Sequence, residues 1–93
     1  MRVAAIVPAY NEKERIPAVL DAIKSAKLVD EIVVVSDGST DGTYELVSSD
    51  PRVTAVQLEP NGGPGRAIAI GAAAGAAAAL GVFLILAAIF AGD

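Results

Sequence analysis

The sequence predicts an α/β fold built on a doubly wound parallel sheet. Three short strand-like runs alternate with two helix-like segments before the chain becomes almost uniformly apolar. The first two runs are apolar without a break, which is typical of strands covered on both faces of a sheet. Strand and helix in this rhythm indicate βαβ units, and such units build parallel sheets.

The first strand is expected from Val3 to Val7 and is ended by Pro8, which cannot donate to a ladder. A helix follows, with apolar residues on one stripe at Ile16, Val19, Leu20 and Ile23. Asn11 with Glu14 three residues later fits a capping box, but a helix beginning there would place Pro17 in its interior. We therefore expect the helix to begin about two residues later, where Pro17 falls in the first turn and needs no partner.

The second strand is expected from Ile32 to Val35 and the third from Val53 to Leu58. Between them, a polar turn leads into a short helix from about Gly42 to Ser48, for which Asp41 is a plausible cap. Ligands of doubly wound sheets bind at the carboxyl ends of the strands. In this chain those ends are Pro8 to Glu12, Ser36 to Asp41 and Glu59 to Gly65.

Composition and charge exclude several classes of function. The chain has no cysteine, which removes disulfides and thiolate chemistry, and no histidine, so acid–base chemistry would fall to carboxylates. A net charge of −4 gives no broad basic surface, and we expect no nucleic acid partner. The apolar run after Met1 is too short for a secretory signal peptide, which makes a cytoplasmic location the default expectation.

Polar residues at the strand ends suit a nucleotide ligand. The ring of Tyr10 can stack on a base, and the carboxylate of Glu12 can accept hydrogen bonds from base or ribose groups. Asp37 follows the second strand and is placed to hold a ribose or base, with Gly38 allowing close approach of a ligand. Each cluster alone is explained more readily by turn formation and helix capping. The glycine-rich segment before Arg66 matches neither phosphate-loop motif and is equally explained as a plain connection.

Taken together and in this order, the motifs resemble the glycosyltransferase family 2 domain over about residues 2 to 71. The matching segments are Ile6-Val7-Pro8-Ala9-Tyr10-Asn11-Glu12, then Glu31 to Thr43 with Ser36-Asp37-Gly38-Ser39-Thr40-Asp41 inside it, and Asn61-Gly62-Gly63-Pro64-Gly65. The sequence looks most similar to the branch that transfers sugars to polyprenyl phosphates. The resemblance implies the nucleotide-binding half of a GT-A fold, truncated before its metal-binding and catalytic part.

The resemblance also implies which residues bind the nucleotide. The family's contacts carry over to Pro8, Tyr10, Glu12 and Asp37, with Val35 lining the base pocket. It implies a UDP- or GDP-linked sugar as the donor and a hydroxyl or lipid phosphate as the acceptor. No catalytic residue and no metal ligand is assigned within this chain.

Three departures from the family pattern bear on activity. Ser36 stands where an Asp is usual, and Pro64 where Lys or Arg is common. The family's Asp-x-Asp motif, which holds Mg²⁺ or Mn²⁺, corresponds to Ala87-Ala88-Ile89, whose side chains offer no oxygen ligand. We expect no cofactor on this chain, and whether it is an enzyme by itself stays open. The alternative is a non-catalytic nucleotide-binding or membrane-attached remnant.

The segment from 67 to 92 has no charged residue and has two interpretations. One helix of this length would extend about 39 Å, enough to cross a hydrocarbon core of about 30 Å, and Gly71 and Gly75 would allow close helix packing. Alternatively, an Ala-rich helix ends near Leu80 and a fourth strand runs from Val82 to Phe90. We favour the membrane helix by a narrow margin. It would attach the nucleotide-sugar-binding portion, residues 1–66, to a membrane.

Overall fold

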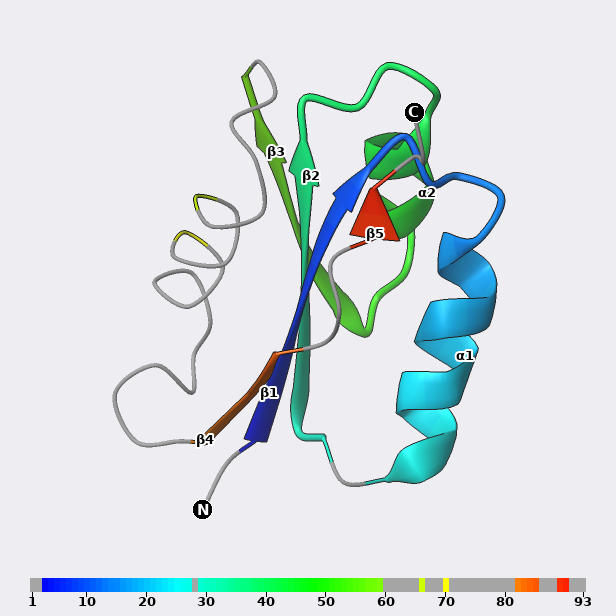
Figure 1. Ribbon diagram of the computed structural model, residues 1–93. Helices are drawn as coiled ribbons and strands as arrows, with labels where there is room; N and C mark the ends of the chain where they lie inside the picture. Colours follow the sequence, from blue (N-terminus) through cyan, green and yellow to red (C-terminus); the bar gives the residue numbers. More distant parts are fainter. Residues whose placement is uncertain are drawn as a thin grey trace.

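The computed structural model describes residues 3–27, 29–59, 66, 70, 82–85 and 89–90. In chain order the elements are β1 (Val3–Tyr10), α1 (Ile16–Ala26), β2 (Glu31–Asp37), α2 (Thr43–Ser48), β3 (Val53–Leu58), β4 (Val82–Ile85) and β5 (Ile89–Phe90). The described strands form one parallel sheet in the order β3-β2-β1-β4, and β5 also pairs with β1 (Figure 1). The predicted α/β fold with a parallel sheet is confirmed.

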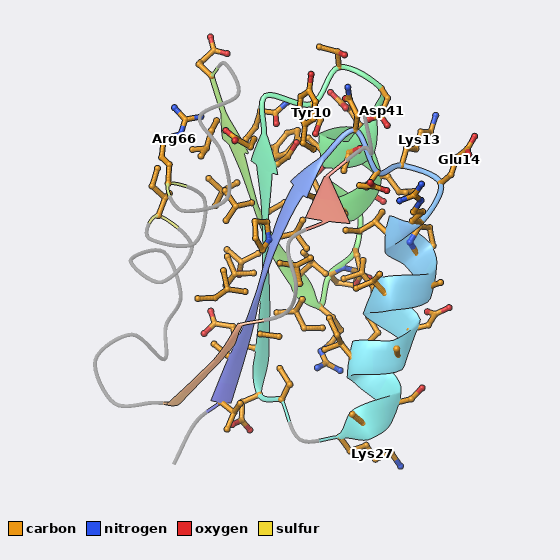
Figure 2. All side chains as sticks on the ribbon, viewed as in Figure 1. Tyr10, Lys13, Glu14, Lys27, Asp41 and Arg66 are labelled. Atoms are coloured by element: carbon orange, nitrogen blue, oxygen red, sulfur yellow. The ribbon has the colours of Figure 1, made fainter. Side chains whose placement is uncertain are left out.

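The direction of the crossovers explains which face of the sheet each helix covers. Crossovers between parallel strands are right-handed in almost all proteins. The steps from β1 to β2 and from β2 to β3 run in the same direction, so α1 and α2 lie on the same face (Figure 1). The chain then returns from β3 to β4 on the far side of β1. The helical residue Arg66 lies on the face opposite α1 and α2 (Figure 2), so described helical residues occur on both sides of the sheet.

Side chains that alternate along the strands fill a core on each face. The larger core consists of Ala5, Val7, Ala9, Ile16, Leu20, Ile23, Ile32, Val34 and Val47, from β1, β2, α1 and α2. On the opposite face, Val33 and Val35 pack with Val56 and Leu58 of β3. Because β1 and β2 are buried on both faces, β1 and the middle of β2, from Ile32 to Val35, are apolar, and the polar residues of β2 lie at its ends.

The first helix begins later than expected, at a residue that still places its proline in the first turn. α1 starts at Ile16, and Pro17 lies in its first turn. Arg15 is the N-cap residue and makes no side-chain capping hydrogen bond, so the alternative capping box is not formed. Instead, the carbonyl of Glu12 accepts from the N–H groups of Arg15 and Ile16 at 3.1 and 2.9 Å.

Several expected boundaries are wrong, and one of them is that β2 runs from Glu31 to Asp37 and so contains Asp37 instead of ending at Val35. β1 does not end at Pro8 but continues to Tyr10, with Pro8 opposite Val35. Among the described residues, β4 pairs with β1 up to Ile6 and β5 pairs with it from Ala9, so no described pairing on that side of β1 includes Pro8. A residue without an N–H is tolerated at such a position. α2 begins one residue later than expected, because Gly42 adopts a φ of 96° and occupies the N-cap position.

The described part of the apolar segment consists mainly of strands. Val82–Ile85 pairs in parallel with Val3–Ile6 and supplies hydrogen-bond partners for the edge of β1 that faces away from β2. The preference for one membrane helix over 67–92 is therefore wrong for residues 82–85 and 89–90, which follow the alternative of a fourth strand. Residues 67–69 and 71–81, with Gly71 and Gly75, lie outside the described residues. No helix within the described ranges has the length and hydrophobicity needed to cross a membrane.

Replacing Ile16 by Ala is expected to lower the free energy of unfolding by about 2–5 kcal/mol, because a fully buried side chain is removed and a cavity remains. The control is Leu46→Ala on α2. Leu46 is 37% exposed, and its loss should change the free energy by less than about 1 kcal/mol. Urea unfolding followed by circular dichroism measures both variants. Equal effects would contradict the assigned core.

Candidate functional site

Four of the five predicted nucleotide-binding residues share one face of the sheet. Pro8 on β1 is the register partner of Val35 on β2. Tyr10 and Asp37 lie two residues further along the same strands, and alternation places them on the same face. Pro8, Val35 and Asp37 are buried, Tyr10 is half-buried, and Figure 2 shows Tyr10 at the arrowhead end of β1. Such folds bind ligands outside the carboxyl ends of their strands, and these residues lie at that end of β1 and β2.

Asp37 is a buried carboxylate that is paired with a cation. Its side chain has no exposed surface, and it forms an ion pair with Arg66, whose side chain is 38% exposed. Nη2 of Arg66 donates to Oδ1 of Asp37 and, at 2.8 Å, to the carbonyl oxygen of Glu59. Burial of a carboxylate costs much less when a cation is paired with it. Sequence analysis missed this pair because its members are 29 positions apart.

Glu12, the fifth predicted residue, comes from the loop after β1. The residue is only 3% exposed. Its Oε1 lies 3.4 Å from Nη1 of Arg15, whose own side chain is 70% exposed. A long contact to an exposed guanidinium neutralises a carboxylate only weakly. Glu12 is therefore a buried acidic side chain beside the strand ends, in long contact with an exposed guanidinium.

Four hydrogen bonds among the described residues join the loop after β1 to the loop after β2. The backbone N–H groups of Asn11, Glu12 and Lys13 donate to Ser39 Oγ at 3.0 Å, Thr43 Oγ1 at 3.0 Å and Asp41 Oδ2 at 3.1 Å, and the N–H of Thr40 donates to Asn11 Oδ1 at 2.8 Å. Asn11 has a φ of 51°, a conformation that asparagine adopts more readily than most residues. The two loops that carry the predicted motifs are thus one hydrogen-bonded unit.

Asp41 accepts hydrogen bonds from both loops. Its Oδ1 accepts from the N–H of Thr43 at 2.9 Å and from the Thr43 hydroxyl, and its Oδ2 accepts from the N–H of Lys13. The prediction that Asp41 caps α2 is confirmed to the extent that its side chain accepts from the N–H of Thr43, the first residue of the helix. The N-cap position itself is occupied by Gly42. Burial acts to raise the pKa of Asp41, but the hydrogen bonds from Thr43 and Lys13 outweigh it and hold the pKa below its usual value.

The structure describes only some of the residues at which this chain departs from the family pattern. Ser36 is fully buried at the end of β2, and its hydroxyl has no hydrogen-bond partner in the described part of the chain. An unpaired carboxylate at this position would cost far more to bury than a hydroxyl does. Among the described residues, no group of three or more carboxylates could hold a metal ion. Pro64, Ala87 and Ala88 lie outside the described residues.

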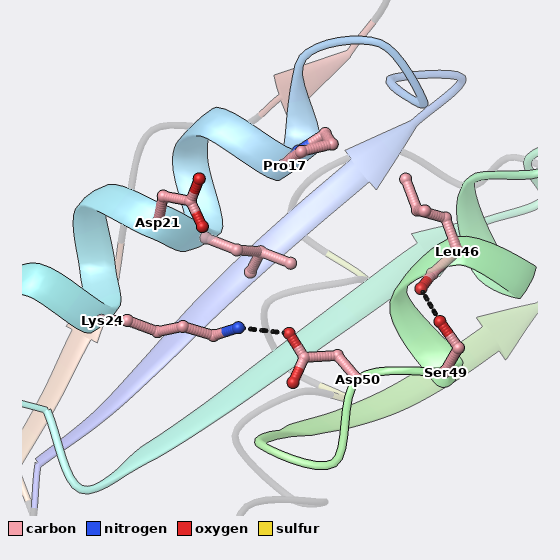
Figure 3. Close-up of a pocket in the computed structure, with 7 residues that line it drawn as sticks. Pro17, Asp21, Lys24, Leu46, Ser49 and Asp50 are labelled. Atoms are coloured by element: carbon pink, nitrogen blue, oxygen red, sulfur yellow. Dashed lines mark hydrogen bonds and ion pairs between the residues drawn. The ribbon is translucent and has the colours of Figure 1, made fainter.

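A cavity of about 300 Å³ lies between α1 and α2, away from the predicted site (Figure 3). It is lined by Pro17, Leu20, Asp21, Lys24, Leu46, Ser49 and Asp50. Lys24 and Asp50 form an ion pair in it. The hydrogen bond from the Lys24 side chain, with a second from the N–H of Arg52, holds the pKa of Asp50 below its usual value. None of the five predicted nucleotide-binding residues lines this cavity.

The lowered pKa of Asp41 predicts a dependence of stability on pH. A carboxyl group with a lowered pKa in the folded state contributes stability above its unfolded pKa, about 3.9, and loses it as pH falls through the folded pKa. Asp41→Asn should therefore destabilise most above about pH 5, with the difference from the unsubstituted protein shrinking as the pH falls toward 2. Urea unfolding across this range measures it. A difference that does not change with pH would contradict the assigned hydrogen bonds.

Comparison with known proteins identifies the family of this chain. The model of the family described as "Glycosyl transferase family 2" matches residues 4–85. Undecaprenyl-phosphate 4-deoxy-4-formamido-L-arabinose transferases of Yersinia pestis (strain Pestoides F) and Yersinia pseudotuberculosis serotype O:3 (strain YPIII) are 37% identical to it over 79 residues. The match covers 75% of this chain and 24% of each relative, so the chain spans about a quarter of their length. The resemblance to the polyprenyl-phosphate sugar transferases is confirmed, and the chain belongs to glycosyl transferase family 2.

Proposed function

We propose that this chain is the nucleotide-sugar-binding half of a transferase that moves a glycosyl group from a UDP- or GDP-linked donor to a lipid phosphate or another acceptor hydroxyl. The observation that carries the proposal is the shared position of Pro8, Val35, Tyr10 and Asp37 on one face, at the carboxyl ends of two adjacent strands. The names of the relatives, which act on undecaprenyl phosphate, support a lipid phosphate as the acceptor.

The residues at the strand ends have the chemistry that a nucleoside needs. Pro8 and Val35 are fully buried on this face, and the half-buried ring of Tyr10 on the same face suits stacking on the flat face of a base. Asp37 and Glu12 supply carboxylate acceptors for N–H and O–H groups of base and ribose. In this proposal, both carboxylates bind and orient the nucleotide, and neither takes part in the transfer step.

The family's divalent cation does not fit the residues of this chain. Ala87 and Ile89 stand at the positions that match Asp-x-Asp and have no oxygen in their side chains, whereas Mg²⁺ and Mn²⁺ require oxygen ligands. The proposal therefore includes no metal-dependent step on this chain. A lipid-linked acceptor would bring the protein to the cytoplasmic side of a membrane, and membrane association is part of the proposal.

The same departure favours a second candidate, a non-catalytic nucleotide-binding or membrane-attached remnant. Both candidates require nucleotide binding, and they differ in transfer. Incubation of the chain with a radiolabelled UDP-sugar and undecaprenyl phosphate in detergent distinguishes them. Labelled lipid supports the transferase and overturns the remnant, whereas nucleotide binding without labelled lipid is expected of either candidate, because the chain is only half of the proposed transferase.

Replacing Asp37 by Asn is expected to weaken nucleotide binding about ten- to a hundredfold, because a hydrogen bond to a charged acceptor contributes about 1.5–3 kcal/mol. The matched control is Asp50→Asn. Asp50 is also paired with a cation, but it lies in the cavity between α1 and α2, and its loss should leave affinity unchanged. Calorimetry with UDP and GDP, with and without Mn²⁺, measures the affinities, and urea unfolding verifies that both variants are folded.

Binding that is insensitive to Mn²⁺ and weakened by the Asp37 substitution alone would support the proposal. If the folded chain binds neither UDP nor GDP, or if both substitutions weaken binding equally, the assigned nucleotide site is wrong.

A further inference from the structure

Glu12 differs from the other four residues of the proposed site in how its backbone is held. Pro8, Tyr10, Val35 and Asp37 belong to β1 and β2, and the sheet ladder fixes them. Glu12 lies in the loop beyond β1, where no ladder holds the chain. Its position relative to Asp37 therefore depends on contacts that the loop itself makes.

The backbone N–H and carbonyl groups of Glu12 have hydrogen-bond partners at the starts of α2 and α1. Its N–H donates to Oγ1 of Thr43 at 3.0 Å, in a buried hydrogen bond between residues 31 positions apart. Its carbonyl oxygen accepts from the N–H groups of Arg15 and Ile16 at the start of α1. Thr43 is itself fully buried at the first position of α2. The backbone of Glu12 is thus fixed between the first turns of two helices.

The carboxylate of Asp41 determines the direction of the hydrogen bonds through Thr43. An ionised carboxylate only accepts, so the Thr43 hydroxyl donates its proton to Oδ1 of Asp41. The lone pairs of the hydroxyl are then available to the N–H of Glu12. The result is a chain of two hydrogen bonds, called the relay below. The Glu12 N–H donates to the Thr43 hydroxyl, and this hydroxyl donates to Asp41. The negative charge of the acceptor Asp41 strengthens such a chain.

We propose that Thr43, oriented by Asp41, is a positioning residue of the nucleotide site, and that its hydroxyl sets the place of Glu12 relative to Asp37. The inference rests on the proposed function. Thr43 does not touch the nucleotide in this account. It holds the loop residue that does, and it links the end of β1 to the loop after β2 through one buried hydroxyl group.

The isosteric pair Thr43→Val and Thr43→Ser separates the hydroxyl from the shape of the side chain. Valine keeps the branched shape but leaves the buried Glu12 N–H without its acceptor, whereas serine keeps the hydroxyl and loses only a methyl group. Valine should weaken the affinity for UDP or GDP about five- to tenfold, which corresponds to the loss of one hydrogen bond. Serine should stay within about twofold of the unsubstituted chain.

Val47→Ala controls for a purely structural effect. Val47 lies one turn further along α2 and is fully buried in the core, so its truncation destabilises the same helix without touching the relay. Calorimetry on the full chain with UDP and GDP gives the affinities of all variants, and urea unfolding gives their stabilities. We expect Val47→Ala to lose stability and keep its affinity, and Thr43→Val to lose affinity. Unchanged affinity in Thr43→Val, or an equal loss in Val47→Ala, would overturn the proposal.

Hydrogen exchange of the Glu12 amide tests the role of Thr43 even if the chain binds no nucleotide. Should the folded chain bind neither UDP nor GDP, the nucleotide site is wrong, but the relay still predicts the protection of one amide. Exchange of the Glu12 N–H should be about tenfold faster in Thr43→Val than in Thr43→Ser, since only valine removes its acceptor. Equal exchange in the two variants would overturn the positioning role of Thr43, whatever the outcome for nucleotide binding.

Discussion

The parallel pairing of β1 with β2 is the constraint on which the rest of the structure depends. Both strands are buried on both faces, and their register sets Pro8 opposite Val35. A slip of one residue would exchange the two faces of a strand, and with them the contacts to both cores. This register also brings the two carboxyl ends level. The loops that follow can then bond to each other through Asn11, Glu12 and Lys13.

Much of the fold can be predicted from the sequence because the deciding signals are local. Continuous apolar runs identify β1 and β2, and Pro17 locates the start of α1, because its missing N–H suits only the first turn. The extension of β1 through Pro8 cannot be predicted locally, since it depends on pairing with β2, where Pro8 is opposite Val35 and Ala9 opposite Ser36, and with β5 from Ala9. The apolar segment is ambiguous for the same reason. Its Ala, Leu and Ile residues suit a helix or a strand, and the open edge of β1 favours strands at 82–85 and 89–90.

The location of the candidate site can be predicted from the sequence, but the hydrogen bonds and the ion pair within it cannot. Parallel strands end at one edge, so placing Tyr10 and Asp37 together requires only the order of elements. The Asp37–Arg66 pair and the relay through Thr43 join residues about thirty positions apart, and in the sequence Thr43 reads as an ordinary turn residue. Family membership suggests roles for these residues, and the structure supplies the hydrogen bonds through which they cooperate.

We propose that a nucleotide binds at the carboxyl ends of β1 and β2. The most direct test of this proposal is the change in backbone amide chemical shifts when UDP or GDP is added to the ¹⁵N-labelled chain. Binding at these strand ends should shift the amide resonances of Tyr10, Glu12 and Asp37 together at saturating nucleotide. The amide resonances of Lys24 and Leu46, beside the cavity between α1 and α2, should not shift. Shifts confined to the cavity between α1 and α2, or no shifts in a folded chain, would contradict the proposal.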